Sequence, residues 1–451
     1  MDTMAEPTCR KSFSISTKSS CPSSYQRVFR LAFGRVALNN EVATVRARKC
    51  GTLFASQMRR WGDRGTRLIP IANVRTLEGR LGTVERFDDQ PLGDSPHLAV
   101  LFQDKLGGFV VATPLLRGLK EKYPDAVLDY FGGERTSELE AACPYIDARF
   151  SLYGQSASVR NVSAFLAERE REAGSYALAI NLDFNPLNAV VTAMTGARFV
   201  VGRCLKPDGR GDLPFRDTLL DRMQDAKTFW AGEDFLAQFG SQLSSNFIGE
   251  IFCRVARVET DFHRTEVPTV APAIPIPDVL IATGGTRSAK LWPVDYWQDL
   301  IGRCAQAGLT IGLLGAAPSV QKAAYGSADG EASLLRETAL LDLRGKFTLP
   351  EVAGALAQAR GCVTIDNGIM HLASAVGTPT VALFGASPAE LWAPQLPWLQ
   401  VSMPKVPCTL CQENRFLNEG CLRERHVCME SLTPEGVFQQ LQARLRPGPS
   451  H

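Results

Sequence analysis

The sequence predicts an α/β protein built from two doubly wound domains that face a cleft. Two runs of short apolar strands alternate with amphipathic helices, one beginning near residue 96 and one near residue 277. Such strands are typical of a parallel sheet that is covered by helices on both faces. A stretch with four prolines separates the runs and predicts an interdomain linker: Pro268, Pro272, Pro275 and Pro277.

Composition excludes several other classes of protein. Apolar residues make up 45% of the 451 residues and charged residues 21%, which is an ordinary globular mixture. This balance argues against a disordered chain, a collagen-like repeat and a coiled coil. The chain has no uninterrupted apolar stretch of the ~18–20 residues that a membrane helix needs.

Residues 1–94 stand apart from the rest of the chain by their charge. They carry 16 basic and nine acidic residues, whereas the overall formal charge is only +2. The segment is rich in Ser and Arg and shows weak periodicity, so we expect an extension that is disordered or acts in targeting. An over-extended gene start would give the same composition.

The first domain is expected over residues 95–265. A buried strand at 97–102 leads through a glycine turn at 105–108 into an amphipathic helix at 109–123. Further strands are expected at 126–131 and 177–182. Because parallel strands end at one edge of a sheet, the loops after these strands should line the cleft.

The second domain is expected over residues 266–432, and a C-terminal helix and tail over 433–451. Its strands are expected at 279–282, 310–314, 361–365 and 380–384, with a helix at 294–307 and another that reaches residue 376. Ligands of two such domains bind at the carboxyl ends of the strands.

Two loops of the second domain have the residues of an anion site. After the strand at 279–282, a glycine pair is followed by the Thr286 hydroxyl and the Lys290 charge, which suit a phosphate. After the strand at 361–365, either Asp366 or Asn367 is placed to cap a helix whose N-terminus attracts an anion. His371 lies in the first turns of that helix. A third glycine turn, at 384–388, is expected to be a plain turn.

Four of the 12 cysteines are clustered near the C-terminus. Four thiolates in one short, loop-like stretch have the ligand count of a tetrahedral structural Zn or Fe site, with His426 as an alternative ligand. Two disulfides or unligated thiols are the competing interpretations. The four residues are Cys408, Cys411, Cys421 and Cys428.

Taken together, these segments resemble the bacterial heptosyltransferases of glycosyltransferase family 9, from about Leu98 to Val437. The most specific block runs from Asp366 to Pro379 and continues through the next strand to Phe384-Gly385. In the family, this block has the pattern Asp-Ser/Thr-Gly-x-x-His-Leu-Ala-Ala-Ala, then Gly-x-Pro. Further matches lie at 104–107, 113–114, 290–293 and 343–351 and in the cysteine-rich tail.

The resemblance implies a GT-B fold of two Rossmann-like domains and a C-terminal helix that often packs back on the first. It implies inverting transfer of a heptose or related sugar from an ADP-sugar to a lipopolysaccharide core or other envelope glycan. No cofactor would be required for transfer, and no divalent cation. By the family's pattern, the donor would be bound by Thr286, Lys290, Phe347, Leu349, Asp366, Asn367, Gly368 and His371.

One position departs from the family's pattern. Members of the family usually have the sequence Asp-Lys-Leu-Gly-Asp in the first loop, and its final Asp is the expected general base. In this chain the same position is Gly108. Glycine has no group that accepts a proton. Asp104 or Asp183 are the candidate substitutes, and weakened activity or donor binding without transfer is the other outcome.

The partners implied are an ADP-sugar and a lipid-linked or lipopolysaccharide acceptor, with peripheral membrane contact and no nucleic acid. The resemblance implies a cytoplasmic protein, at the inner face of the inner membrane. A non-catalytic binder on the same fold is the main alternative. A sugar-nucleotide epimerase is disfavoured, because the Gly107-Gly108 pair lacks the third spaced glycine of a dinucleotide-binding loop.

Overall fold

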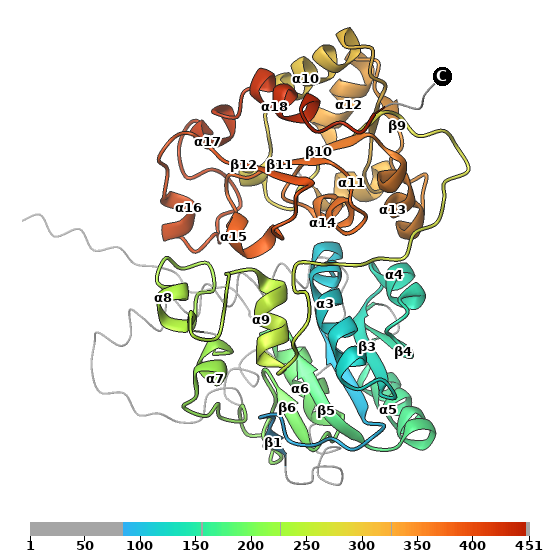
Figure 1. The fold of residues 1–451 in the computed structure, drawn as a ribbon, viewed down its shortest axis with the longest axis vertical. Coiled ribbons are helices and arrows are strands. Elements are labelled where there is room, and N and C mark those ends of the chain that lie inside the picture. Colours follow the sequence, from blue (N-terminus) through green and yellow to red (C-terminus); the bar gives the residue numbers. More distant parts are fainter. Residues whose placement is uncertain (1–83, 155–156, 226, 326, 448–451) are drawn as a thin grey trace, which may run out of the picture. The chain divides into compact units, whose positions relative to one another are not determined.

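The computed structural model describes residues 84–154, 157–225, 227–325 and 327–447. These residues form two parallel α/β sheets of six strands each (Figure 1). The two runs predicted from the sequence therefore do form two separate sheets. Across the described part of the chain, no helix combines the length and apolar character that a bilayer crossing requires.

The first sheet has the strand order β1-β6-β5-β2-β3-β4, and all of its pairings are parallel. The central strand β2 is buried at every residue because both of its faces are covered. The strands are β1 (Glu85–Arg86), β2 (His97–Leu101), β3 (Val127–Gly133), β4 (Ala148–Tyr153), β5 (Tyr176–Asn181) and β6 (Phe199–Val201).

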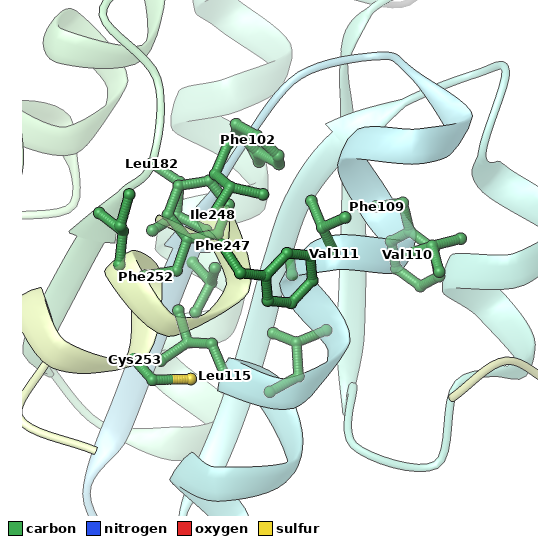
Figure 2. Packing of buried hydrophobic residues seen from close by; sticks show 14 of the residues in the cluster. Phe102, Phe109, Val110, Val111, Leu115, Leu182, Phe247, Ile248, Phe252 and Cys253 are labelled. Atoms are coloured by element: carbon green, nitrogen blue, oxygen red, sulfur yellow. The ribbon is translucent and has the colours of Figure 1, made fainter. Parts of the chain in front are cut away.

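Alternating residues of the first sheet enter different hydrophobic clusters. Leu98 and Val100 pack with α3 and α9, whereas Ala99 and Leu101 pack with α5 and α6. Figure 2 shows part of the first of these clusters, where Phe247 and Phe252 of the α9 region lie near Phe102 and side chains of α3. The helices are α3 (Leu106–Lys122), α4 (Ser137–Ala142), α5 (Val159–Ala173), α6 (Pro186–Met194), α7 (Leu219–Met223), α8 (Phe235–Phe239) and α9 (Ile248–Val255).

The second sheet has the order β12-β11-β10-β7-β8-β9, again wholly parallel. Its centre is the pair β7 and β10, which places the loops after these two strands side by side. The strands are β7 (Val279–Ala282), β8 (Ile311–Leu313), β9 (Leu341–Asp342), β10 (Gly361–Ile365), β11 (Thr380–Leu383) and β12 (Leu399–Ser402).

Helices also cover both faces of the second sheet. One face packs with α10, α12 and α18, and the other with α13 and α14. The elements are η2 (Ser288–Lys290), α10 (Val294–Gln306), α11 (Pro318–Ala324), α12 (Ala328–Glu337), α13 (Leu349–Gln358), α14 (Gly368–Ala375), α15 (Ala389–Trp392), α16 (Leu410–Glu413), α17 (Val427–Glu430) and α18 (Pro434–Gln442).

The predicted boundary of the first domain, at residue 95, lies too far along the chain. β1 pairs with β6, and the neighbouring Phe87 is 3% exposed within the core. Arg86 donates to the carbonyls of Gly202, Leu213 and Pro214. Residues 84–94 therefore belong to the first domain, while the rest of the predicted extension lies outside the described residues.

Two further expectations are corrected. The turn expected at residues 105–108 is partly helical, because α3 begins at Leu106 and contains Gly107 and Gly108. The C-terminal helix α18 packs on α10, β10 and β11, so it completes the second domain. Its Val437 and Leu441 are fully buried in that domain's core and hold it there.

Candidate functional site

The junction between β10 and α14 is organised by Asn367. Its Oδ1 accepts hydrogen bonds from the N–H groups of Ile369 (2.9 Å) and Met370 (3.3 Å), so it is the N-cap of α14. Its Nδ2 donates to the carbonyl of Gly284 at 2.9 Å. The Asn367 side chain therefore joins the two loops that were predicted to bind an anion, and these hydrogen bonds engage both its Oδ1 and its Nδ2.

Lys290, which is partly buried, and the buried Asp366 form an ion pair at the same place. The ammonium Nζ lies against Asp366 Oδ2 and also donates to the Asp366 carbonyl at 3.3 Å. Burial works to raise the pKa of Asp366, but Lys290 and His371 outweigh it and hold that pKa below its usual value. The site thus holds a charged pair at the N-terminus of α14.

His371 is neutral at physiological pH. Its side chain is almost fully buried, and burial lowers its pKa to about 4; Asp366 opposes that shift and Lys290 adds to it. A neutral imidazole here can donate a hydrogen bond without adding a second cation beside Lys290.

Two glycines let the two domains touch at this point. A Cβ on Gly107 of α3 would lie 2.6 Å from His371 Cδ2, and a Cβ on Gly368 of α14 would lie 2.7 Å from Leu106 Cδ2. Any side chain at either position would force the helices apart. The N-terminal turns of α3 and α14 are therefore in direct contact.

The remaining predicted donor residues lie on loops at the same edge of the second sheet. Thr286 is exposed between β7 and η2. Phe347 lies between β9 and α13 and Leu349 is the first residue of α13, and both are partly buried against the large core cluster. The Leu349 N–H donates to Glu138 of α4 at 2.6 Å, which joins this loop to the first domain.

Arg287 was missed by the sequence analysis. Its guanidinium donates to the carbonyls of Phe416 (2.7 Å), Asn418 (3.1 Å) and Ala386. It thereby ties the loop after β7 to the turn at residues 384–388 and to the cysteine-rich segment. That turn is thus more than a plain turn. The only signal in the sequence was the position of Arg287 inside the glycine loop.

The four clustered cysteines lie near one another. The pKa of Cys428 is raised to about 11, mainly by burial, with smaller contributions from Cys411, Cys421 and Cys408. The Cys411 and Cys421 sulfurs accept N–H hydrogen bonds from Asn418 and Arg423 at 3.4 Å, as metal-bound thiolates commonly do. Within residues 84–447 as described, however, no group of three or more potential ligands is arranged to hold a metal ion.

In the first domain, three predicted positions surround the start of α3. Gly108 is buried in its first turn, where an added Cβ would meet Phe102 Cε1 at 3.1 Å. Asp104 precedes that turn, and its carboxylate contacts the loop after β3. Asp183 follows β5, the neighbour of β2 on the opposite side. Burial raises the pKa of both carboxyls.

A comparison with protein families finds a similarity over most of the second domain. Residues 250–420 match the family described as glycosyltransferase family 9 (heptosyltransferase). The matched region contains the Lys290–Asp366 pair, Arg287 and the N-terminal part of the cysteine-rich segment.

Individual family 9 relatives extend the similarity into the first domain. Lipopolysaccharide heptosyltransferase 1 of Pseudomonas aeruginosa is 31% identical over 179 residues, which cover 38% of this chain and 48% of the relative. The chain therefore spans about half the length of that relative. Lipopolysaccharide heptosyltransferase 3 of Escherichia coli K12 is 23% identical over 294 residues, which cover 64% of this chain and 82% of the relative.

Solved structures of family 9 proteins share the fold. A family 9 glycosyl transferase from Veillonella parvula matches with a TM-score of 0.58 at 16% identity, covering 79% of this chain and 99% of that one. The heptosyltransferase WaaC of E. coli with ADP gives 0.52 at 17% identity, covering 77% and 99%. The predicted GT-B fold is thus confirmed.

The neutral state of His371 predicts a dependence of stability on pH. In the unfolded chain its pKa returns to about 6.5, so between about pH 6.5 and 4 the unfolded state binds more protons. This contribution to stability is complete above pH 6.5 and is lost as the pH falls, by up to about 1.4 kcal/mol per pH unit. Urea unfolding of the wild type and His371→Gln at several pH values measures it. Parallel curves for the two proteins would contradict the assignment.

The contacts of Arg287 predict local loosening when it is replaced. Arg287→Lys keeps the charge but loses the fork that reaches three carbonyls, so amide hydrogen exchange should accelerate at residues 414–420 and 384–388. Arg303→Lys, on the exposed face of α10, is the control and should leave both segments unchanged. Unchanged exchange in the Arg287 variant would show that these bonds do not hold the segment.

The spacing of the four cysteines in the sequence predicts bound metal, although the described residues do not bring three or more ligands together to hold one. Elemental analysis of the purified protein should find about one Zn or Fe per chain, and Cys408→Ser and Cys421→Ser should each reduce it. Cys304→Ala, which removes a buried thiol of α10 far along the chain from the cluster, should leave the metal content unchanged. If the protein purified without chelator contains no metal, the thiols are unligated and the prediction is wrong.

Proposed function

We propose that this chain is an inverting glycosyltransferase that moves a heptose or related sugar from an ADP-sugar to a lipopolysaccharide core or other envelope glycan. The observation that carries the proposal is the partly buried Lys290–Asp366 pair at the N-terminus of α14, the helix whose Gly368 and His371 contact the α3 turn of the other domain. The names of the relatives, which are lipopolysaccharide heptosyltransferases, support the same reaction.

The second domain has the groups that a departing diphosphate needs. As the bond between the sugar and the diphosphate breaks, negative charge grows on the phosphate oxygens. Lys290, the Thr286 hydroxyl and the positive end of the α14 dipole stabilise that charge. Such a site works without a divalent cation, and in this proposal transfer needs no cofactor. The metal at the cysteine cluster, if bound, has a structural role.

A second candidate function is favoured by Gly108. Without a general base the same site binds a nucleotide sugar but transfers it slowly or not at all. Loss of a base typically costs about 10²–10⁴ in rate. On this alternative the chain is a catalytically impaired nucleotide-sugar-binding homologue.

One experiment separates the two functions. ADP binding is measured by calorimetry, and ADP release from ADP-heptose is measured with heptose-free lipopolysaccharide and excess chelator. Binding with acceptor-dependent release supports the transferase, and binding without release supports the impaired homologue. Lys290→Ala should weaken ADP binding at least about tenfold, because it leaves Asp366 unpaired beside the phosphates. Absence of ADP binding would contradict both functions.

A further inference from the structure

Two carboxylates flank the first turn of α3, and the structure gives them different tasks. Asp104 follows β2, and Asp183 follows β5, which is the neighbour of β2 in the sheet. Resting on the proposed transferase function, we propose that Asp183 is the general base of the reaction, in the role that Gly108 cannot fill.

Asp104 is committed to holding a loop. Its Oδ1 accepts the Arg135 N–H at 2.9 Å, and its Oδ2 lies 3.8 Å from Arg135 Nε. A Cβ on Gly133 would lie only 2.1 Å from the same Oδ1. The Asp104 carboxylate therefore fills the space above Gly133 and fixes the loop between β3 and α4, on the side of β2 away from Asp183.

Asp183 is held in place by neutral groups. Its backbone N–H donates to Asn181 Oδ1 at 2.9 Å, and its carboxylate accepts from the N–H (3.2 Å) and the side-chain amide of Asn185. Asn185 is itself fixed, because its Nδ2 also donates to the Tyr153 hydroxyl at 2.7 Å. These bonds orient the carboxylate without neutralising it.

The electrostatics of this position suit a base. Burial raises the pKa of Asp183, while the Asn185 hydrogen bonds and the Lys105 charge limit the rise. The Tyr153 phenol also interacts with Asp183, and its own pKa is raised by burial, by Asp183 and by Asp104. A carboxylate whose pKa is raised by burial is more basic than one in water.

The Asp183 carboxylate is also near the donor side. Lys105, whose charge acts on it, is followed by Leu106 and Gly107, the residues that contact Gly368 and His371. A Cβ on Gly108 would lie 3.7 Å from the Lys105 Cβ. Asp183 follows β5 and position 108 follows β2, so the two positions come after neighbouring strands of the sheet.

The step is balanced as a single displacement. An Asp183 carboxylate oxygen takes the proton of the acceptor hydroxyl, and the acceptor oxygen forms the new bond to the anomeric carbon. The bond from that carbon to the diphosphate breaks, and ADP leaves with the electron pair. Asp183 later returns its proton to solvent.

The test uses a conservative variant and a rescue. Asp183→Asn keeps an oxygen that accepts the Asn185 N–H, so the turn should fold, but it cannot take a proton. We expect kcat for ADP release with heptose-free lipopolysaccharide to fall about 10²–10⁴-fold, with the KM for ADP-heptose and the melting temperature little changed. Adding Gly108→Asp to this variant should raise its kcat at least about tenfold, because the substitution returns a carboxylate to the first turn of α3.

Asp104→Asn is the matched control and should keep most of kcat, since an Asn oxygen still accepts the Arg135 N–H. The proposal is overturned if Asp183→Asn keeps wild-type kcat, or if Asp104→Asn loses as much. Loss of activity that Gly108→Asp does not restore, together with a lowered melting temperature, would assign Asp183 a structural role and also overturn it. Wild-type protein that binds ADP but never releases it from ADP-heptose would instead refute the transferase function itself.

Discussion

The close approach of two helix N-termini is the constraint on which the site depends. The ring of His371 occupies the space beside Gly107, and Leu106 occupies the space beside Gly368. One hydrophobic cluster continues through this contact, from α3 and α9 to α13 and α14. Because both glycines are needed, the contact fixes the distance between the Lys290–Asp366 pair and the turn that holds Lys105. The candidate donor and acceptor groups are brought together by packing, before any ligand binds.

Much of this could be predicted from the sequence, because buried parallel strands have a strong apolar signal. The strands at 279–282 and 361–365 lie where they were expected, and the loops after them meet because β7 and β10 are neighbours. What the sequence could not show was how side chains are shared between distant segments. Asn367 bonds to a carbonyl 83 residues away, and Arg287 to carbonyls 99 to 131 residues away. A local pattern predicts a donor but carries no information on its partner.

The predictions that were wrong also have physical reasons. β1 has two residues, too few for any periodicity, and what fixes it is the reach of the Arg86 side chain to three carbonyls of another segment. The start of α3 was placed too late because Gly107 and Gly108 have low helix propensity. Tertiary contact overrides that propensity, since only a glycine at position 107 leaves room for His371.

The charge states in the site matter for the proposed reaction as much as its shape. A buried ion pair contributes little to stability, since desolvation offsets most of the attraction, so the Lys290–Asp366 pair is better explained by function. Lys290 lowers the pKa of Asp366 and so favours its ionised form, which keeps the pair ready for a diphosphate. His371 stays neutral, which avoids a second buried cation while still offering a donor. In the first domain, the Lys105 charge only limits the rise in the pKa of Asp183, and in the proposed step that carboxylate is the group that accepts a proton.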